Sequence, residues 1–202
     1  MEIGILGTGG VALTLAERWS AAGHRMALGS RDPSSKSDLN FPVSPVDALV
    51  ADHEVVVNAT PGSASLEFLT RIGSAKFSGK VLIDVANAST PSFELVYPNS
   101  SLAEKIQDAL PDTHVVNTLN TAAMTVMTEP GALPASSIFV SGDNQGAKAT
   151  VVTLLKDFGW TGDTIVDLGG IQSSRGPEHY FLMFAALMQS LRTPQFNIHL
   201  VH

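Results

Sequence analysis

A glycine-rich segment near the amino terminus has the residue types and the spacing of a phosphate-binding turn. The segment Gly7-Thr8-Gly9-Gly10-Val11-Ala12 fits the pattern G-x-G-x-x-G/A, and it joins an apolar run at residues 3–6 to a helical pattern at residues 11–22. The first glycine permits a tight turn, the second lets a diphosphate approach the backbone, and Ala12 keeps the helix close to the strand. Free N–H groups at the start of the helix favour an anion there. A glycine-rich turn of another kind of α/β protein is the alternative, but this context favours a dinucleotide site at Gly7, Thr8, Gly9, Gly10 and Val11.

The second apolar run ends in residues that suit a 2′-phosphate. An NAD-binding chain places an Asp or Glu on the ribose hydroxyls about 20 residues beyond the glycines, whereas this sequence reads Gly29-Ser30-Arg31. A hydroxyl beside a guanidinium can bind a phosphate, because Arg makes paired, charge-assisted hydrogen bonds, and Lys36 adds positive charge. Asp32 is the alternative ribose ligand, but its place between Arg31 and Pro33 is typical of a turn or capping residue. The segment therefore predicts NADP(H) as the cofactor.

Two later segments combine polar and turn-forming residues directly after apolar runs. They read Asn58-Ala59-Thr60-Pro61-Gly62 and Asp84-Val85-Ala86-Asn87. Open α/β sheets bind ligands at the carboxyl ends of their strands, so we expect these segments to line the nicotinamide half of the cofactor. Ordinary turn chemistry explains the individual side chains equally well. The residues expected to line the nicotinamide half are Ala59, Thr60, Pro61, Ala86 and Asn87.

The elements that must position these residues alternate along the chain as short apolar runs and helical stretches. This alternation predicts an α/β protein, a doubly wound Rossmann NADP-binding sheet with a small C-terminal α/β lobe. We expect strands at residues 3–6, 26–29, 41–43, 54–58, 80–84, 114–119, 137–141, 164–167 and 196–201, and helices at residues 11–22, 45–50, 63–72, 101–110, 145–158 and 178–191. The predicted domains are residues 1–142, which bind the nucleotide, and residues 143–202, which form the small lobe that covers the substrate cleft.

Composition excludes several other classes of function. The chain has 202 residues, 44% of them hydrophobic, a formal net charge of −7 and no cysteine. The negative charge and the scattered basic residues argue against a nucleic-acid partner. Without cysteine there are no disulfides, thiolate nucleophiles or Cys-ligated metals, and the six histidines show no metal-ligand spacing, so we expect no metal site. The most apolar segment, residues 180–188, is far shorter than the ~20 residues of a membrane span, so we expect a cytoplasmic protein with no membrane partner.

Segments spread over nearly the whole chain carry a resemblance to a known family. Besides the glycine motif they are Gly29-Ser30-Arg31, Asn58-Ala59-Thr60-Pro61, Val81-Leu82-Ile83-Asp84, His114-Val115-Val116-Asn117-Thr118-Leu119-Asn120-Thr121, Phe139-Val140-Ser141-Gly142-Asp143 and Asp167-Leu168-Gly169-Gly170-Ile171. Together they resemble the deazaflavin (coenzyme F420)-dependent NADP reductase family. The resemblance implies reversible hydride transfer between NADPH and C5 of a deazaflavin, with no catalytic side chain, because both reacting partners carry the redox chemistry.

The resemblance also implies roles for particular residues. Ser30 and Arg31 would hold the 2′-phosphate. A second group, Asn120, Thr121 and Met124, would lie near the two rings, and a third would face the same cleft from the C-terminal lobe: Ser173, Ser174, Arg175 and Glu178. The chain departs from the family at Asn117, where a Lys is frequent, and its loop after Arg31 is less basic than usual. The hydride acceptor therefore stays open between coenzyme F420, a flavin and another small substrate.

Two other functions share the same nucleotide domain. A β-hydroxyacid or imine reductase would need a large helical C-terminal domain with a catalytic Lys, and this chain is too short for one. A non-catalytic NADP(H) sensor would keep the nucleotide site and respond to its occupancy by changing partners. The apolar stripe of the last helix favours packing in the core or in a homodimer over contact with a planar cofactor; it consists of Phe181, Met183, Phe184, Leu187, Met188 and Leu191.

Overall fold

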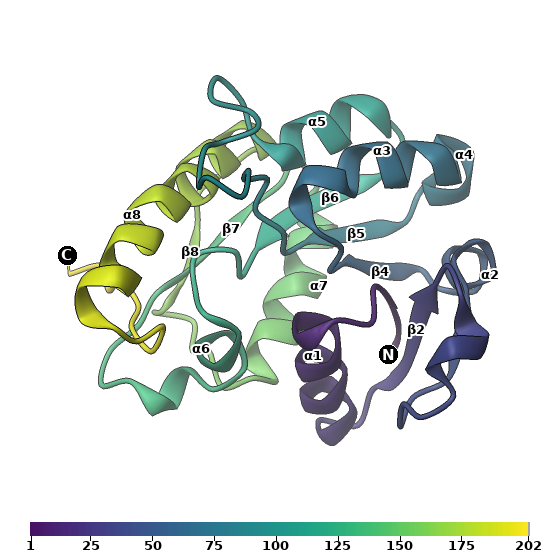
Figure 1. Cartoon of the computed structure of the whole chain (residues 1–202), viewed down its shortest axis with the longest axis horizontal. Helices are drawn as coiled ribbons and strands as arrows, with labels where there is room; N and C mark the ends of the chain where they lie inside the picture. The colour runs from purple at the N-terminus through teal and green to yellow at the C-terminus, as the bar shows by residue number, and fades with distance from the viewer. Residues whose placement is uncertain (202) are drawn as a thin grey trace.

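The protein folds around one twisted sheet with helices on both faces, in a computed structural model that describes residues 1–201 (Figure 1). The strand order is β3-β2-β1-β4-β5-β6-β7-β8. The strands are β1 Glu2–Leu6, β2 Arg25–Ser30, β3 Val43–Pro45, β4 Val55–Asn58, β5 Val81–Asp84, β6 His114–Thr118, β7 Ile138–Ser141 and β8 Ile165–Asp167. The helices are α1 Gly10–Ala21, α2 Val46–Asp52, α3 Gly62–Ile72, α4 Ser74–Phe77, α5 Leu102–Ala109, α6 Met124–Thr128, α7 Gln145–Lys156 and α8 Arg175–Leu191, with short 3₁₀ turns η1 Pro33–Lys36, η2 Pro130–Ala132 and η3 Ile171–Ser174.

The strand order confirms the predicted Rossmann fold and locates its ligand edge. From β1 the chain builds the sheet in one direction through β2 and β3, then returns to β4 on the other side and continues to β6. The order of the strands therefore reverses between β1 and β4, and such sheets bind ligands at the carboxyl end of this switch point. The glycine motif follows β1 and lies at this edge.

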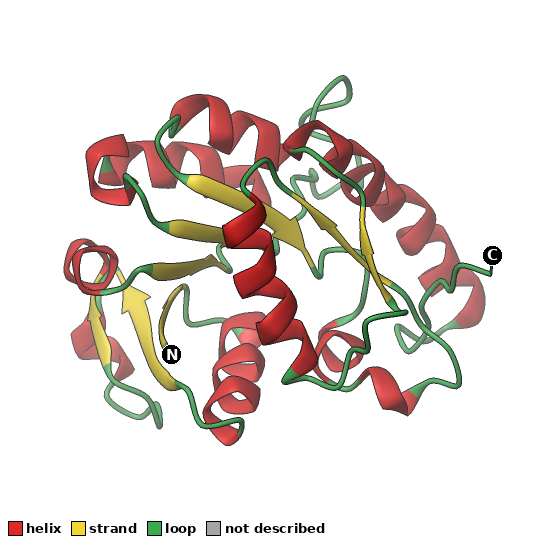
Figure 2. Ribbon diagram, turned by 180° about the vertical axis from the view of Figure 1, so that it is seen from behind, coloured by secondary structure: helices red, strands yellow, loops and turns green. Residues whose placement is uncertain are grey.

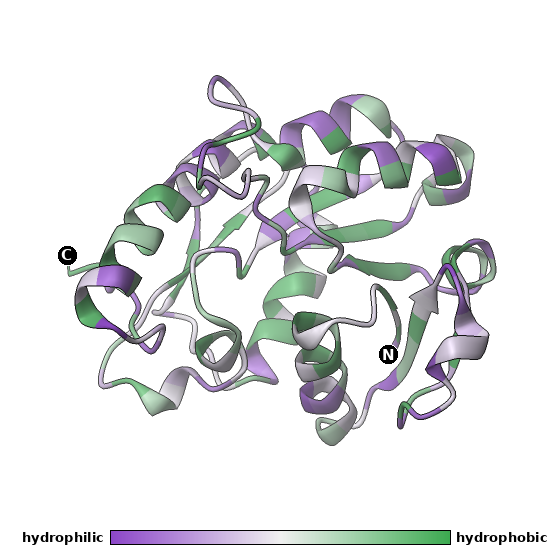
Figure 3. Ribbon diagram, in the orientation of Figure 1, coloured by the Kyte–Doolittle hydropathy of each residue, from purple (hydrophilic) through white to green (hydrophobic). Residues whose placement is uncertain are grey.

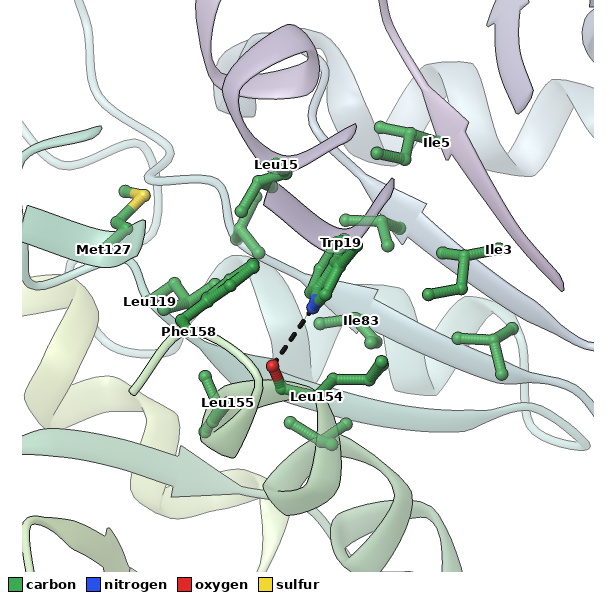
Figure 4. Close-up of a cluster of buried hydrophobic side chains, with 14 of the residues drawn as sticks. Ile3, Ile5, Leu15, Trp19, Ile83, Leu119, Met127, Leu154, Leu155 and Phe158 are labelled. Carbon is green, nitrogen blue, oxygen red and sulfur yellow. Dashed lines mark hydrogen bonds between the residues drawn. The ribbon is translucent and has the colours of Figure 1, made fainter. Parts of the chain in front are cut away.

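Two apolar cores hold the helices to the sheet. On one face α1, α6 and α7 cover the strands, and α2 to α5 cover the other (Figures 1 and 2). In the first core the Trp19 ring stacks on Phe158 with 4.8 Å between ring centroids, and the Trp19 Nε1–H donates to the Leu154 carbonyl oxygen at 3.1 Å (Figure 4). The strands are apolar along most of their length (Figure 3), as expected for a sheet that is buried on both faces.

The seventh strand differs from the parallel arrangement that the alternation predicts, because β7 runs antiparallel to β6. The connecting segment forms only the short α6 and η2, and α6 packs beside α1 in the first core. A parallel neighbour needs a crossover that carries the chain back to the other edge of the sheet. This segment stays near the carboxyl edge, so the next strand enters the sheet from that side.

The predicted strand at residues 196–201 is wrong. These residues form no strand. The Ser137 N–H, just before β7, donates to the Ile198 carbonyl oxygen at 2.9 Å, and the Phe196 ring packs on Phe184 of α8. Both edges of β7 are already paired, with β6 and β8, so no free edge remains for the tail. The predicted last helix exists but begins earlier than expected, at Arg175.

Residues on both sides of Gly142 belong to one sheet. The β8 strand pairs parallel with β7, and α7 contributes Val151, Leu154 and Leu155 to the core that α1 also fills. The division into a nucleotide domain and a C-terminal lobe at Gly142 stays a prediction. None of the helices within residues 1–201 combines the length and the apolar character needed to cross a lipid bilayer.

Candidate functional site

The first glycine of the motif forms a turn that no other residue could form without strain. Gly7 has a φ of 123°, and its N–H donates to the Gly29 carbonyl oxygen at 3.1 Å. A Cβ at this position would lie 2.8 Å from the carbonyl oxygen of Ala59. The turn is therefore held between the ends of β2 and β4, close to the switch point of the sheet.

The start of α1 is open on the side where a diphosphate would lie. The helix begins at Gly10, and Gly9 is its N-cap with no side-chain hydrogen bond to the first turn. A Cβ on Gly9 would meet no atom within 4 Å, so the space in front of it is free. The unpaired N–H groups and the positive end of the helix dipole both favour an anion at this place.

Met124 lies beside the same loop. A Cβ on Gly10 would lie 3.3 Å from the Met124 Sδ, and Met124 begins α6. The side chain is partly exposed at the end of the sheet that carries the glycine motif. The structure therefore brings Met124 to the nucleotide loop, from a segment far away in the sequence.

Ser30 and Arg31 follow β2 next to the glycine turn. Leu6 at the end of β1 is in register with Gly29, so the two strand ends adjoin. Arg31 is exposed, and within residues 1–201 its guanidinium forms no ion pair and no hydrogen bond. Lys36, at the end of η1, likewise has no ion-pair partner among these residues. Arg31 directly follows Ser30, and Lys36 lies on η1, which packs against β2 and β3.

Asp32 is engaged in the turn that follows. It precedes η1, its Oδ1 accepts a hydrogen bond from the Ser34 hydroxyl at 2.6 Å, and its carbonyl oxygen accepts one from Ser35 at 2.9 Å. The Ser34 hydrogen bond is the main cause that lowers the pKa of this carboxyl. These contacts agree with the interpretation of Asp32 as a turn residue, and they leave Arg31 as the charged group free for a ligand.

A row of buried polar residues ends the three central strands. Asn58, Asp84 and Asn117 are the last or next-to-last residues of β4, β5 and β6, and they lie in matching register. Asn58 Nδ2 donates to Asp84 Oδ1 at 2.8 Å, and Asn117 Nδ2 donates to the Asp84 carbonyl oxygen at 3.2 Å. Sequence reasoning considered the backbone of these segments and missed the row, although a polar residue that ends each apolar run was its visible signal.

The loops above this row are tied to one another. Asn58 Oδ1 accepts a hydrogen bond from the Thr60 hydroxyl at 2.6 Å. Asn87 Nδ2 donates to the Asn120 carbonyl oxygen at 2.7 Å, and Asn120 Nδ2 donates back to Asn87 Oδ1 at 3.1 Å. A Cβ on Gly62 would lie only 2.1 Å from the Asn87 carbonyl oxygen, so the first two loops also pack closely. The structure thus brings together the predicted residues 59–61, 86–87 and 120.

The C-terminal group of predicted site residues lies against the start of α5. The Ser174 and Ser101 hydroxyl oxygens are 2.7 Å apart, and Glu178 Oε2 accepts a hydrogen bond from the Leu102 N–H at 2.6 Å. Both Ser174 and Glu178 are buried. These two side chains therefore fasten α8 to α5, a pairing between distant segments that the sequence did not reveal.

Ser173 and Arg175 also have partners within the fold. Ser173 Oγ donates to Ser141 Oγ at 2.8 Å. Arg175 forms two hydrogen bonds to the Glu104 carboxylate, at 2.8 and 2.7 Å, and this contact lowers the pKa of Glu104. η3 packs against β6, β7 and α5, so the C-terminal group adjoins the strand from which Asn120 and Thr121 follow. Thr121 itself is buried.

Two buried carboxyl groups have unusual protonation. Burial raises the pKa of Asp84 to about 7, although hydrogen bonds from Asn58 and the Ala86 N–H oppose the shift. Burial also raises the pKa of Glu178 to about 8, against the hydrogen bond from Leu102, and the negative charge of Asp84 raises it further.

Within residues 1–201 no group of three or more His, Cys, Asp or Glu side chains could hold a metal ion.

Comparison with known proteins gives the family. Residues 2–88 match the family model described as NADP oxidoreductase, coenzyme F420-dependent. The crystal structure of an Arthrobacter sp. FB24 protein, assigned as an F420-dependent NADP reductase, is 35% identical in sequence and superposes with a TM-score of 0.93, covering 100% of both chains. The chain belongs to the coenzyme F420-dependent NADP oxidoreductase family. The predicted family, one of NADP-dependent oxidoreductases, is therefore confirmed.

More distant relatives share the fold or part of the sequence. The chain is 28% identical to rat metalloreductase STEAP3 over 183 residues, which cover 88% of this chain and 36% of the relative. Human metalloreductase STEAP2 is also 28% identical, with 89% and 35% covered. The chain thus spans about a third of the length of these curated relatives. A hypothetical protein from Sinorhizobium meliloti, 24% identical with a TM-score of 0.72 over 86% of this chain and 87% of its own, shares the fold.

Proposed function

We propose that this member of the family transfers a hydride between NADP(H) and a deazaflavin of the coenzyme F420 type. NADPH, when bound, supplies the hydride from its nicotinamide ring. The protein has to hold both rings at reacting distance and exclude water, which accounts for a large part of the rate in such reactions and needs no catalytic side chain.

The nucleotide fits the residues at the carboxyl edge of the sheet. The open space before Gly9 and the start of α1 suit the diphosphate, and the free guanidinium of Arg31 beside Ser30 suits the 2′-phosphate. We assign the diphosphate to Gly7, Thr8, Gly9, Gly10 and Val11, the 2′-phosphate to Ser30, Arg31 and Lys36, and the nicotinamide half to Ala59, Thr60, Pro61, Ala86 and Asn87.

One observation carries the choice of NADP(H) over NAD(H). Arg31 has no partner within residues 1–201, while Asp32, the rival ribose ligand, is engaged by Ser34 and Ser35. An unpaired cation at the end of β2 gains charge-assisted hydrogen bonds only if the ligand carries a phosphate there. Isothermal calorimetry tests this assignment: NADPH should bind far more tightly than NADH, and equal affinities would contradict it.

The acceptor site is proposed where the loop after β6 adjoins η3. Asn120, Thr121 and Met124 would contact the second ring from the sheet side, and Ser173 and Arg175 from the C-terminal side. Ser174 and Glu178 are buried against α5, so they would shape this site by fixing the start of α8. Because the side chains offer hydrogen bonds and apolar contacts without a titrating nucleophile, the arrangement suits ring binding.

A screen of acceptors tests this assignment of function. NADPH oxidation is followed at 340 nm with a deazaflavin, FMN, FAD, a ferric chelate and small carbonyl compounds. The proposal expects turnover with the deazaflavin to exceed that with every other acceptor. Faster turnover with the ferric chelate would favour a metal reductase, and tight NADPH binding with no turnover at all would favour a sensor; either outcome would contradict the proposal.

A further inference from the structure

Asp84 lies below the surface at the point where three loops of the proposed site begin. Its Oδ1 accepts hydrogen bonds from Asn58 Nδ2 at 2.8 Å and from the Ala86 N–H at 3.4 Å. Its backbone oxygen accepts a hydrogen bond from Asn117 Nδ2 at 3.2 Å. One fully buried residue is thus bonded to the ends of β4 and β6 as well as to the loop after its own strand, β5.

These contacts continue outward to the residues assigned to the nicotinamide. Asn58, which is hydrogen-bonded to Asp84, accepts hydrogen bonds at Oδ1 from the hydroxyl and the N–H of Thr60. Beyond Ala86, Asn87 exchanges two hydrogen bonds with Asn120. A change at Asp84 therefore reaches both sides of the proposed ring site.

We propose that Asp84 is a positioning residue for hydride transfer, which sets the spacing between the loop that carries Thr60 and the loops that carry Asn87 and Asn120. The inference rests on the proposed function, which places the nicotinamide over these loops. Asp84 is buried beneath them, so it acts on the reaction through them. Small displacements of reacting groups matter, because a misplacement of about 1 Å can reduce a rate by roughly 100-fold.

Glu178 makes the positioning role of Asp84 depend on pH. Asp84 Oδ2, Glu178 Oε1 and Asn117 Oδ1 are buried, and none has a hydrogen-bond partner within the described residues. All three oxygens accept hydrogen bonds and none receives one from a donor; the hydroxyl oxygens of Thr121 and Tyr180 are also buried without a partner. A proton on one of the carboxyl groups would supply that donor and remove the repulsion between two buried like charges.

Among residues 1–201, no cation acts on Asp84 or Glu178 in place of this proton. Arg175, on the same helix as Glu178, is held by Glu104, whose own negative charge also faces Glu178. His179 Nε2 lies 3.0 Å from the Ser100 carbonyl oxygen, and the neighbours of Asp84 on β4 and β6 are neutral amides. The Leu102 N–H and Tyr97 also face Glu178.

The pair therefore keeps at least one proton near neutral pH, in agreement with the raised pKa values of both groups. When the second carboxyl ionises at alkaline pH, repulsion acts between the end of β5 and the start of α8. We expect this repulsion to displace the loops that are hydrogen-bonded to Asp84 and to leave exposed Arg31 unaffected. The rate of hydride transfer should then fall at high pH while the affinity for NADPH does not.

Three variants test the inference through kcat, the NADPH dissociation constant and the pH profile. Asp84→Ala removes the acceptor for Asn58 and Ala86, so kcat should fall about tenfold or more with the NADPH dissociation constant within about threefold. Asp84→Asn keeps an oxygen in place of Oδ1 and stays neutral. It should restore kcat near neutral pH and abolish the alkaline decline, because a second charge can no longer form.

Thr113→Val is the matched control. Thr113 is buried, and its hydroxyl donates to the Phe77 carbonyl oxygen at 3.2 Å. It directly precedes β6, so it lies at the amino edge of the sheet, opposite the proposed site. It should lower stability and leave kcat and the pH profile unchanged. The inference is wrong if Asp84→Ala retains kcat, if the control loses kcat equally, or if Asp84→Asn keeps the wild-type pH profile; the last result decides alone if Asp84→Ala does not fold.

A readout without any acceptor separates this inference from the proposed function. The fluorescence lifetime of bound NADPH reports how firmly the nicotinamide is held. Asp84→Ala should bind NADPH with a shorter lifetime than the wild type or Thr113→Val. If the wild type reduces no deazaflavin but the lifetime shortens, the proposed function fails and the role of Asp84 stands; an unchanged lifetime in a variant that binds NADPH overturns the role.

Discussion

Replacing Arg31 with Ala removes an exposed guanidinium that forms no ion pair or hydrogen bond within residues 1–201. The folded state loses no contact, so the free energy of unfolding should change by less than about 0.5 kcal/mol. If the guanidinium binds the 2′-phosphate, the loss is that of a hydrogen bond to a charged group, about 1.5–3 kcal/mol. This corresponds to NADPH affinity lower by roughly 10- to 150-fold. NADH lacks the phosphate, so its affinity should stay nearly constant.

Calorimetric titration of both nucleotides measures the two effects in one experiment. Arg71→Ala is the control, because Arg71 is an exposed arginine on α3 whose only ion pair within the described residues is with Glu67 on the same helix. It should leave both affinities unchanged. Equal weakening of NADPH and NADH by Arg31→Ala, or an effect on NADPH no larger than that of Arg71→Ala, would refute the assignment of Arg31 to the 2′-phosphate.

Three further predictions follow from the same geometry. Gly9→Val should fold, as circular dichroism would show, but lose NADPH affinity, because its side chain enters the open space before α1; retained affinity would place the nucleotide elsewhere. Gly7→Ala should lower the unfolding free energy in urea by about 1–3 kcal/mol or more, since φ is 123° and Ala59 O is 2.8 Å from the added Cβ; full stability would refute this contact. Glu178→Gln should remove a loss of unfolding free energy that the wild type shows as pH rises from near 4.5 to about 8. Urea denaturation midpoints that change with pH equally in the variant and the wild type would contradict this.

The sign of the last effect follows from the raised pKa of Glu178. Its folded-state pKa, about 8, lies above the ordinary value of 4.5, so the folded protein holds a proton that the unfolded chain has lost in this interval. Stability from this group is complete below the unfolded value and is lost as pH rises through the folded one. The neutral Gln has no such dependence, and the difference should reach the order of a few kcal/mol.

The sequence predicted the central strands and the nucleotide turn because local patterns specify them. Apolar runs ended by Asn58 and Asp84 mark two strands and their carboxyl ends, and the glycine spacing after β1 marks the turn. The direction of β7 was not predictable, since it depends on where the segment that includes α6 packs. The tail near Ile198 was alternating and apolar enough for a strand, but it lies at the start of β7, whose two edges are already paired with β6 and β8.

The side-chain partners across the site were also beyond local reasoning. The bond between Glu178 and the Leu102 N–H joins residues 76 positions apart, and no spacing rule relates them. Asp84 was visible as the end of an apolar run, whereas its contacts with Asn58 and Asn117 required the register of three strands. Tertiary packing decides such contacts, and a sequence pattern predicts only which edge of the sheet they share.

The most direct test of hydride transfer between NADP(H) and a deazaflavin is a single-turnover measurement with both reactants. NADPH carrying deuterium at the transferred position of C4 is mixed with the wild-type enzyme and oxidised deazaflavin, and the products are analysed by mass spectrometry. The deuterium should appear on the reduced deazaflavin, without exchange with water. Oxidation of NADPH that leaves no deuterium on the deazaflavin, or no reduction of the deazaflavin at all, would contradict it.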